Sequence, residues 1–348
     1  MSLATQTLPR VGRARRPSPV EWLRTPRPPL PVPRWLRVAL VVAGGAGLVA
    51  VPLLNPSYVT LPITLVMVWT IVGLGMNLLV GFGGQISLGH SAFFAIGAYA
   101  VAVGGESGLG PLLPLVIAGI VPFAVGYLIG LPALRLRGLQ LGLVTLALAM
   151  ATPAVIRMLE PITHGSRGIR IDGDPPAGIP LAHDQWVYYL ALVVAALAYV
   201  LTRRLSRGRL GRSFVAVRDA ELVAQTLGVD IAQTKTRLFA ASAAYAGVAG
   251  GIYALLLEFI GPENFGLMLS ISFITLIVVG GLATVGGAVL GALFIQYVPM
   301  WTASISPAAT GAAYGIVLVV FAFFVPFGLV GLARGILGPL LTRLRGRR

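Results

Sequence analysis

Long, almost uninterrupted apolar runs fill the chain, and each is close to the length that a helix needs to cross a bilayer. Ten runs of about 20 residues each can be drawn: 36–54, 60–80, 86–104, 112–134, 138–158, 186–202, 238–258, 268–283, 286–302 and 310–331. A backbone in lipid must satisfy its own hydrogen bonds, and a helix does so within one segment. The runs therefore predict an all-α integral membrane protein with about ten transmembrane or partly re-entrant helices. Runs 86–104, 268–283 and 286–302 are short or interrupted by glycine, so some of these are expected to be broken or re-entrant.

Charged residues are few and are concentrated in four segments. Only 11% of the 348 residues are charged, whereas a soluble domain has about 25%. Of the 26 Lys and Arg residues, 23 lie in 1–37, 134–138, 203–237 and 334–348. Ten spans place these four segments on one side, which the positive-inside rule assigns to the cytoplasm. The net charge of +15 is then a consequence of topology, and no nucleic-acid partner is expected.

The same topology divides the chain into domains. Residues 1–35, rich in Pro and Arg, are predicted to form a disordered basic cytoplasmic tail, and 334–348 a second basic cytoplasmic tail. Residues 36–333 are predicted to form the transmembrane domain, in the inner or plasma membrane, with both termini cytoplasmic. Two long loops interrupt this domain: 159–185 on the external side and 203–237 on the cytoplasmic side.

Several kinds of chemistry have no residues to support them. Cysteine is absent, and the three histidines are not in a metal-ligand spacing. The only lysine is Lys235, and no G-x-x-x-x-G-K-[ST] motif exists to bind ATP. We expect no enzyme activity, metal or cofactor. A membrane chain with no ATP site and few buried charges is expected to be a transport subunit powered by another polypeptide.

A glycine-rich run at membrane depth is the first candidate site. Residues 81–90 read GFGGQISLGH, and a second glycine-rich break lies at 280–287. Two such breaks in corresponding halves point to a translocation path and a possible internal pseudo-repeat. Gln85, Ser87, His90 and the preceding Asn77 are predicted to line this path. In the alternative interpretation, Gln85 and His90 satisfy backbone groups that the Gly83–Gly84 break sets free.

Glycine pairs four residues apart also occur within the apolar runs. Such pairs allow helices to approach closely, and they predict packing contacts at Gly126/Gly130, Gly287/Gly291 and Gly311/Gly315.

The loop 203–237 has a helical pattern in its middle. Five residues recur there at spacings of three to four: Phe214, Val217, Glu221, Ala224 and Gly228. Gly228 fits the position just after a helix end, where glycine adopts the left-handed conformation. The pattern predicts a short amphipathic helix on the inner face, which either lies on the membrane surface or docks a cytoplasmic partner. The charges at 218–221 are either part of that docking helix or an ordinary solvated face.

Four segments together resemble a known family. They are "GLGMNLLVGFGGQISLGHSAFFAIGAYA" (73–100), "LRLRGLQLGLVTLALA" (134–149), "THGSRGI" (163–169) and "GRSFVAVRDAELVAQTLGVDIAQTKTRLFAASAAYAGVAGGIYA" (211–254). In this order they resemble the branched-chain amino acid ABC permeases of the LivH/LivM type, and LivM in particular. The resemblance covers about residues 40–333.

The resemblance implies an ATP-binding-cassette importer for branched-chain or similar aliphatic amino acids. Its implied partners are a second, LivH-like permease subunit, two cytoplasmic ATPase subunits and an external solute-binding protein, with membrane lipid around the chain. The residues that it implies for ATPase coupling are Arg218, Asp219, Glu221, Ala224 and Gly228.

Two segments depart from the family pattern. The chain has Thr163-His164-Gly165 where the family often has Thr-Gly-Gly, and Leu139-Gln140 where it commonly has Asp and Tyr. These departures bear on the substrate, so a urea or short-amide importer stays open. A stand-alone channel or secondary carrier is the other alternative.

Overall fold

The computed structural model describes residues 34–133, 139–171, 175, 180–305, 315–316, 319 and 328–332. Most of the two predicted tails, the 134–138 loop and most of the run 310–331 lie outside the described residues. The regular secondary structure of the described part is helical apart from one two-stranded sheet.

Nine of the ten predicted runs coincide with helices. In chain order these are α2 (Arg34–Leu54), α3 (Ser57–Met76), α4 (His90–Glu106), α5 (Leu112–Ala133), α6 (Leu139–Met158), α8 (His183–Arg207), α11 (Ile231–Leu257), α12 (Leu267–Gly280) and α13 (Val285–Ile305). Shorter elements join them: the π-helix η1 (Asn77–Phe82), α7 (Glu160–Thr163), η2 (Gly165–Arg167), β1 (Ile169–Arg170), α9 (Arg209–Asp219), α10 (Glu221–Thr226), β2 (Phe259–Ile260) and η3 (Pro262–Phe265).

Seven helices of the described part are long and apolar enough to cross a membrane, judged by length and composition. They comprise Ser57–Phe82, Leu112–Leu131, Gln140–Met158, His183–Arg207, Ile231–Leu257, Pro262–Gly280 and Val285–Ser304. The apolar part of α2, Val42–Leu54, is shorter. The run 86–104 is broken at its start, because its helix α4 begins only at His90 and has 17 residues.

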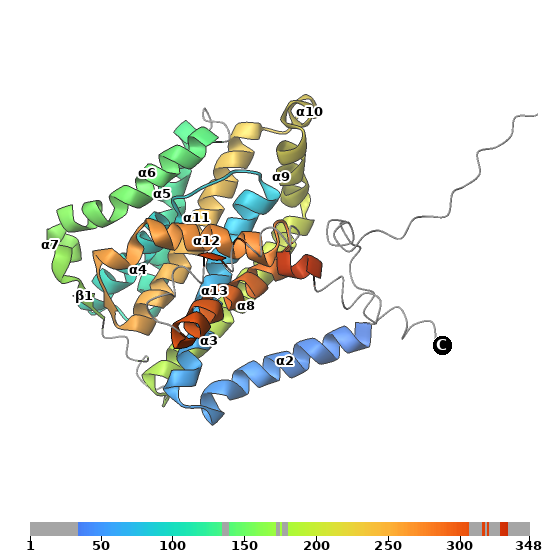
Figure 1. The fold of residues 1–348 in the computed structure, drawn as a ribbon. Coiled ribbons are helices and arrows are strands. Elements are labelled where there is room, and N and C mark those ends of the chain that lie inside the picture. The colour runs from blue at the N-terminus through green and yellow to red at the C-terminus, as the bar shows by residue number, and fades with distance from the viewer. Residues whose placement is uncertain are drawn as a thin grey trace, which may run out of the picture.

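The centre of the bundle is α11, which packs against α3, α4 and α5 (Figure 1). Small residues allow these helices to approach closely. A Cβ added at Gly126 would lie 2.6 Å from the Ala243 Cβ, and one at Gly130 would lie 3.1 Å from the Thr236 Cγ2. The pair Gly287/Gly291 lies against the backbone of α12 in the same way. These two predicted glycine pairs are therefore packing contacts, and Gly311 lies outside the described residues.

The two long loops lie at opposite ends of α11. This helix begins beside α10 and ends at β2, which pairs antiparallel with β1 of the loop 159–185 (Figure 1). Ile169 pairs with Ile260 and Arg170 with Phe259, so the sheet ties that loop to the end of α11. We refer below to these two ends of the bundle as the α9/α10 end and the β1/β2 end.

Candidate functional site

The two glycine-rich breaks of the sequence meet in the structure. After α3 the chain continues as the π-helix η1, whose wider turn is often found at functional sites. The second break is the turn 281–284 between α12 and α13. We name residues 81–84 together with residues 281–284 the glycine junction.

Asn77 connects the two halves of the glycine junction. Its side-chain Nδ2 donates to the Thr284 carbonyl at 2.7 Å, and its Oδ1 accepts from the Ala283 N–H at 2.8 Å. The residue is 1% exposed, so both ends of the amide are used inside the protein. Gly81 lies against the hydrogen-bonded Asn77 side chain. A Cβ at Gly81 would overlap the Asn77 Oδ1 and lie 2.5 Å from the Ala283 nitrogen.

His90 forms a second buried connection, at the start of α4. The Ser242 hydroxyl donates to the Gly75 carbonyl at 2.7 Å, so its oxygen accepts from the His90 Nε2–H, also at 2.7 Å. The other ring nitrogen, Nδ1, lies 3.2 Å from the Ser87 hydroxyl oxygen, within hydrogen-bond distance. This chain of bonds places a proton on Nε2, and it holds the non-helical residues 83–89 against α3 and α11.

The four residues predicted to line the path therefore lie between the start of η1 and the start of α4. In the described conformation Asn77, Ser87 and His90 are buried and bonded to the protein. Gln85 is half-buried and donates to the Lys235 carbonyl at 3.4 Å. This acceptor lies in α11, 150 residues from Gln85 in the chain, and not in the Gly83–Gly84 break.

The loop 203–237 contains two short helices where the sequence predicted one. They are α9 and α10, separated at Ala220, whose φ of −154° and ψ of 78° are not helical. The predicted end of the helical region is confirmed at Gly228, which has a φ of +83°. The Val229 N–H bonds to the Ala224 carbonyl and the Gly228 N–H to the Gln225 carbonyl, each at 3.0 Å, which is the Schellman pattern of a helix end.

Side chains of α9 and α10 that face the bundle are buried, whereas apolar side chains on the outer side of α10 are exposed. Phe214, Val217 and Ala224 are buried against the bundle. On the outer side of α10, Leu222 is 78% exposed and Leu227, just after the helix, is 77% exposed; Val223 is exposed as well. Sequence reasoning missed these three residues. Their signal was available, since they fall between the buried positions of the pattern.

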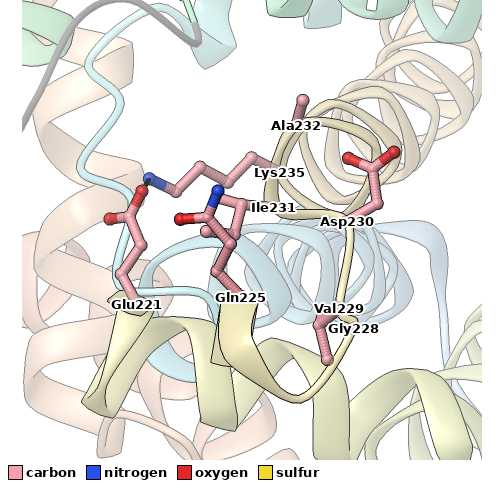
Figure 2. Close-up of a pocket in the computed structure, with 8 residues that line it drawn as sticks. All are labelled: Glu221, Gln225, Gly228, Val229, Asp230, Ile231, Ala232 and Lys235. Carbon is pink, nitrogen blue, oxygen red and sulfur yellow. Dashed lines mark hydrogen bonds and ion pairs between the residues drawn. The ribbon is translucent and has the colours of Figure 1, made fainter. Parts of the chain in front are cut away.

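An open hollow lies between α10 and the start of α11 (Figure 2). It has a volume of about 540 Å³ and is lined by Glu221, Gln225, Gly228, Val229, Asp230, Ile231, Ala232 and Lys235. The Lys235 ammonium and the Glu221 carboxylate meet at 2.8 Å across it. Asp230 points away from that pair (Figure 2), and its Oδ1 caps α11 by accepting from the Gln233 N–H at 2.9 Å.

The implied coupling residues thus divide into two groups. Glu221 and Gly228 line the hollow, and Ala224 is buried beneath α10. Arg218 and Asp219 lie at the end of α9, where the Arg218 Nη1 donates to the Gly81 carbonyl of the glycine junction at 2.6 Å. The Arg218 Nε also donates to the Asp219 Oδ1 at 2.8 Å. This hydrogen bond lowers the pKa of the Asp219 carboxyl below its usual value.

At the β1/β2 end, side-chain contacts join the connecting segments. His164 lies 3.6 Å from Glu106, His183 lies 3.3 Å from Glu258, and Arg157 pairs with Glu263. His164 adopts a left-handed conformation with a φ of 57°. No group of three or more metal-ligating side chains occurs among the described residues.

Comparison with known proteins identifies the family. The family described as "Branched-chain amino acid transport system / permease component" matches residues 59–325. The chain belongs to this family. This permease family accounts for the apolar helices, and the protein is a multi-pass membrane protein.

Three relatives from this comparison show the range of similarity. The permease protein LivM of Escherichia coli K12 is 33% identical over 257 residues, which is 67% of this chain and 60% of that protein. LivH of Salmonella typhimurium is 26% identical over 67% of this chain and 81% of its own length. BraD of Pseudomonas aeruginosa is 24% identical over 76% of this chain and 91% of its own. The chain thus spans about 60% of the E. coli LivM. No solved structure matches the chain.

Proposed function

We propose that the chain is a membrane-spanning permease subunit of an ATP-binding-cassette importer that translocates branched-chain or similar aliphatic amino acids. The proposal is supported by the family, whose relatives LivM, LivH and BraD are named as permeases of high-affinity branched-chain amino acid transport. The proposed partners are a second, LivH-like permease subunit, two cytoplasmic ATPase subunits and an external solute-binding protein.

We propose the inner or plasma membrane as the location, with the α9/α10 end and both termini in the cytoplasm. The charges support this orientation by the positive-inside rule. Among the described residues, eight basic side chains lie at the α9/α10 end: Arg203, Arg204, Arg207, Arg209, Arg212, Arg218, Lys235 and Arg237. At the β1/β2 end, Arg157, Arg167 and Arg170 are accompanied by Glu106, Glu160, Asp184, Glu258 and Glu263.

The observation that carries the ATPase role is the apolar outer face of α10. Leu222, Val223 and Leu227 are exposed at the highly charged α9/α10 end, beside the hollow that Glu221 and Lys235 line. The segment is held rigidly from within by Ala224, by the Glu221–Lys235 ion pair and by the helix end at Gly228. Exposed apolar side chains grouped on a rigid element are a feature of protein interaction sites.

The translocation role of Asn77, Gln85, Ser87 and His90 stays a prediction. Because three of them are buried and bonded in the described conformation, they would contact a solute only after residues 83–89 or the turn 281–284 move. Alternating access in transporters involves such movements around a central site. At the opposite end, the exposed Arg167 and Arg170 are the proposed contacts for acidic groups of the solute-binding protein.

The docking role of α10 predicts the effect of Leu222→Glu and Leu227→Glu. Each change places a charge in an apolar contact, so we expect the affinity of the chain for its ATPase to fall at least about 30-fold. The measurement is binding of the purified ATPase to the detergent-solubilised chain. Leu109→Glu, an exposed leucine at the β1/β2 end, is the matched control and should bind as wild type. Wild-type affinity in both α10 variants would remove the docking role.

A further inference from the structure

We propose that Arg218 is a positioning residue that connects the docking segment to the glycine junction and transmits the movement of one to the other. The inference rests on the proposed function and deepens it. The resemblance places Arg218 on the ATPase-facing segment, whereas the structure directs its guanidinium inward, to a backbone carbonyl 137 residues earlier in the chain.

The guanidinium of Arg218 is held at the end of a membrane span. Its acceptor, the Gly81 carbonyl, is near the end of the helical segment Ser57–Phe82. The last carbonyls of a helix have no partner within the helix, and they carry a partial negative charge that favours a cation. The Arg218 Nη1 supplies both the donor and the charge at 2.6 Å. Arg218 thus connects the end of α9 directly to the end of this span.

The rest of the Arg218 side chain is held as well. Its aliphatic part lies over Gly84, where an added Cβ would be 2.6 Å from the Arg218 Cγ and 3.5 Å from its Cβ and Cδ. Gly84 also has a φ of +66°, a conformation that only glycine adopts readily. Asp219 fixes the guanidinium by accepting from its Nε at 2.8 Å. With three contacts, the side chain is only 32% exposed.

The contacts that begin at Arg218 and Gly81 continue to the turn 281–284, the second half of the glycine junction. Gly81, whose carbonyl binds Arg218, lies directly against the Asn77 amide and the Ala283 nitrogen. Asn77 in turn holds the turn between α12 and α13 through Ala283 and Thr284. A displacement of α9 is therefore carried over bonded or touching groups to both halves of the glycine junction. A contiguous network of this kind is the physical basis for coupling between distant sites.

This geometry needs an arginine. The guanidinium donates from Nη1 and Nε to two acceptors in a fixed fork, whereas a lysine ammonium is a single point donor on a flexible chain. Lysine at this position would keep the charge near the helix end but would not hold Gly81 and Asp219 together. Arg212 lies on the same helix and is exposed, so it offers a matched position of the same charge.

The test compares variants in the complex of the permease pair, two ATPases and the solute-binding protein in proteoliposomes. For Arg218→Ala, we expect solute uptake per ATP hydrolysed to fall at least about fivefold, while ATPase affinity stays at the wild-type value. For Arg218→Lys, uptake per ATP should lie between the values for Arg218→Ala and wild type. Arg212→Ala should match wild type. If Arg218→Ala does not yield folded protein, Arg218→Lys carries the test by the same ratio.

Two results would overturn the role of Arg218. Wild-type uptake per ATP in the folded Arg218 variants would show that the contact transmits nothing. A loss of ATPase affinity as large as that of Leu227→Glu would show that Arg218 belongs to the docking surface instead. Failure of the proposed function would look different, because the wild-type complex itself would then show no ATP-driven uptake.

Discussion

Gly250→Ala is expected to destabilise the helix bundle by about 2–3 kcal/mol, although alanine is the better helix former. A Cβ at Gly250 of α11 would overlap the carbonyl oxygen of Phe94 in α4. The obstacle is backbone, which cannot rotate away as a side chain can. Relief requires the two helices to separate at a buried contact, since Phe94 and Ala249 are both 0% exposed. Thermal unfolding in detergent should show a midpoint lower by about 5 °C or more.

Gly105→Ala provides the matched control for this prediction. Gly105 lies near the end of α4, and an added Cβ there would have nothing within 4 Å. The gain in helix propensity, at most about 1 kcal/mol, should leave the protein as stable as wild type or slightly more so. The same substitution is thus expected to have opposite signs at two positions. Equal midpoints for the two variants would contradict the close α4–α11 contact.

Asn77→Leu is expected to have the second large effect, a loss of about 2–4 kcal/mol of stability. Leucine has a similar size but cannot bond, so the Ala283 N–H and the Thr284 carbonyl lose the partners that Asn77 supplies at 2.8 and 2.7 Å. Each buried polar group left without a partner costs about 1–3 kcal/mol. The turn 281–284 should loosen first, and faster amide hydrogen exchange at Ala283 would show this directly.

Asn55→Ala is the control for Asn77→Leu. The Asn55 side chain also bonds to a backbone carbonyl, that of Val51 at 3.0 Å, but it is exposed to solvent. Its removal should change stability by no more than about 0.5 kcal/mol. If Asn77→Leu lowered stability no more than Asn55→Ala, the two Asn77 hydrogen bonds would not hold the glycine junction together.

Features that depend on local pattern were predictable from the sequence. Apolar runs of spanning length placed nine helices, because the length of a membrane helix is set by the bilayer. The left-handed end at Gly228 was predictable because glycine alone adopts that conformation without cost. The contacts of Gly126 and Gly130 followed from their spacing of four residues.

Features that depend on distant contacts were not predictable. Asn77 bonds to the turn 281–284 and Arg218 bonds to Gly81, and nothing in either segment specifies the other. The break at Ala220 was missed because alanine strongly favours helix, and nothing local predicts its non-helical φ of −154° and ψ of 78°. His90 was predicted to line the path, yet its bond to Ser242 of α11 comes from a helix 152 residues away in the chain.

Uptake of radiolabelled leucine into proteoliposomes tests the central proposal most directly. The chain would be reconstituted with its second permease subunit and ATPases, and the solute-binding protein added, with urea and a short amide as alternative solutes. We expect uptake of leucine, isoleucine and valine that requires both ATP and the binding protein, and none from the chain alone. Gradient-driven uptake by the chain alone, without ATP, would contradict the account and would indicate a channel or secondary carrier.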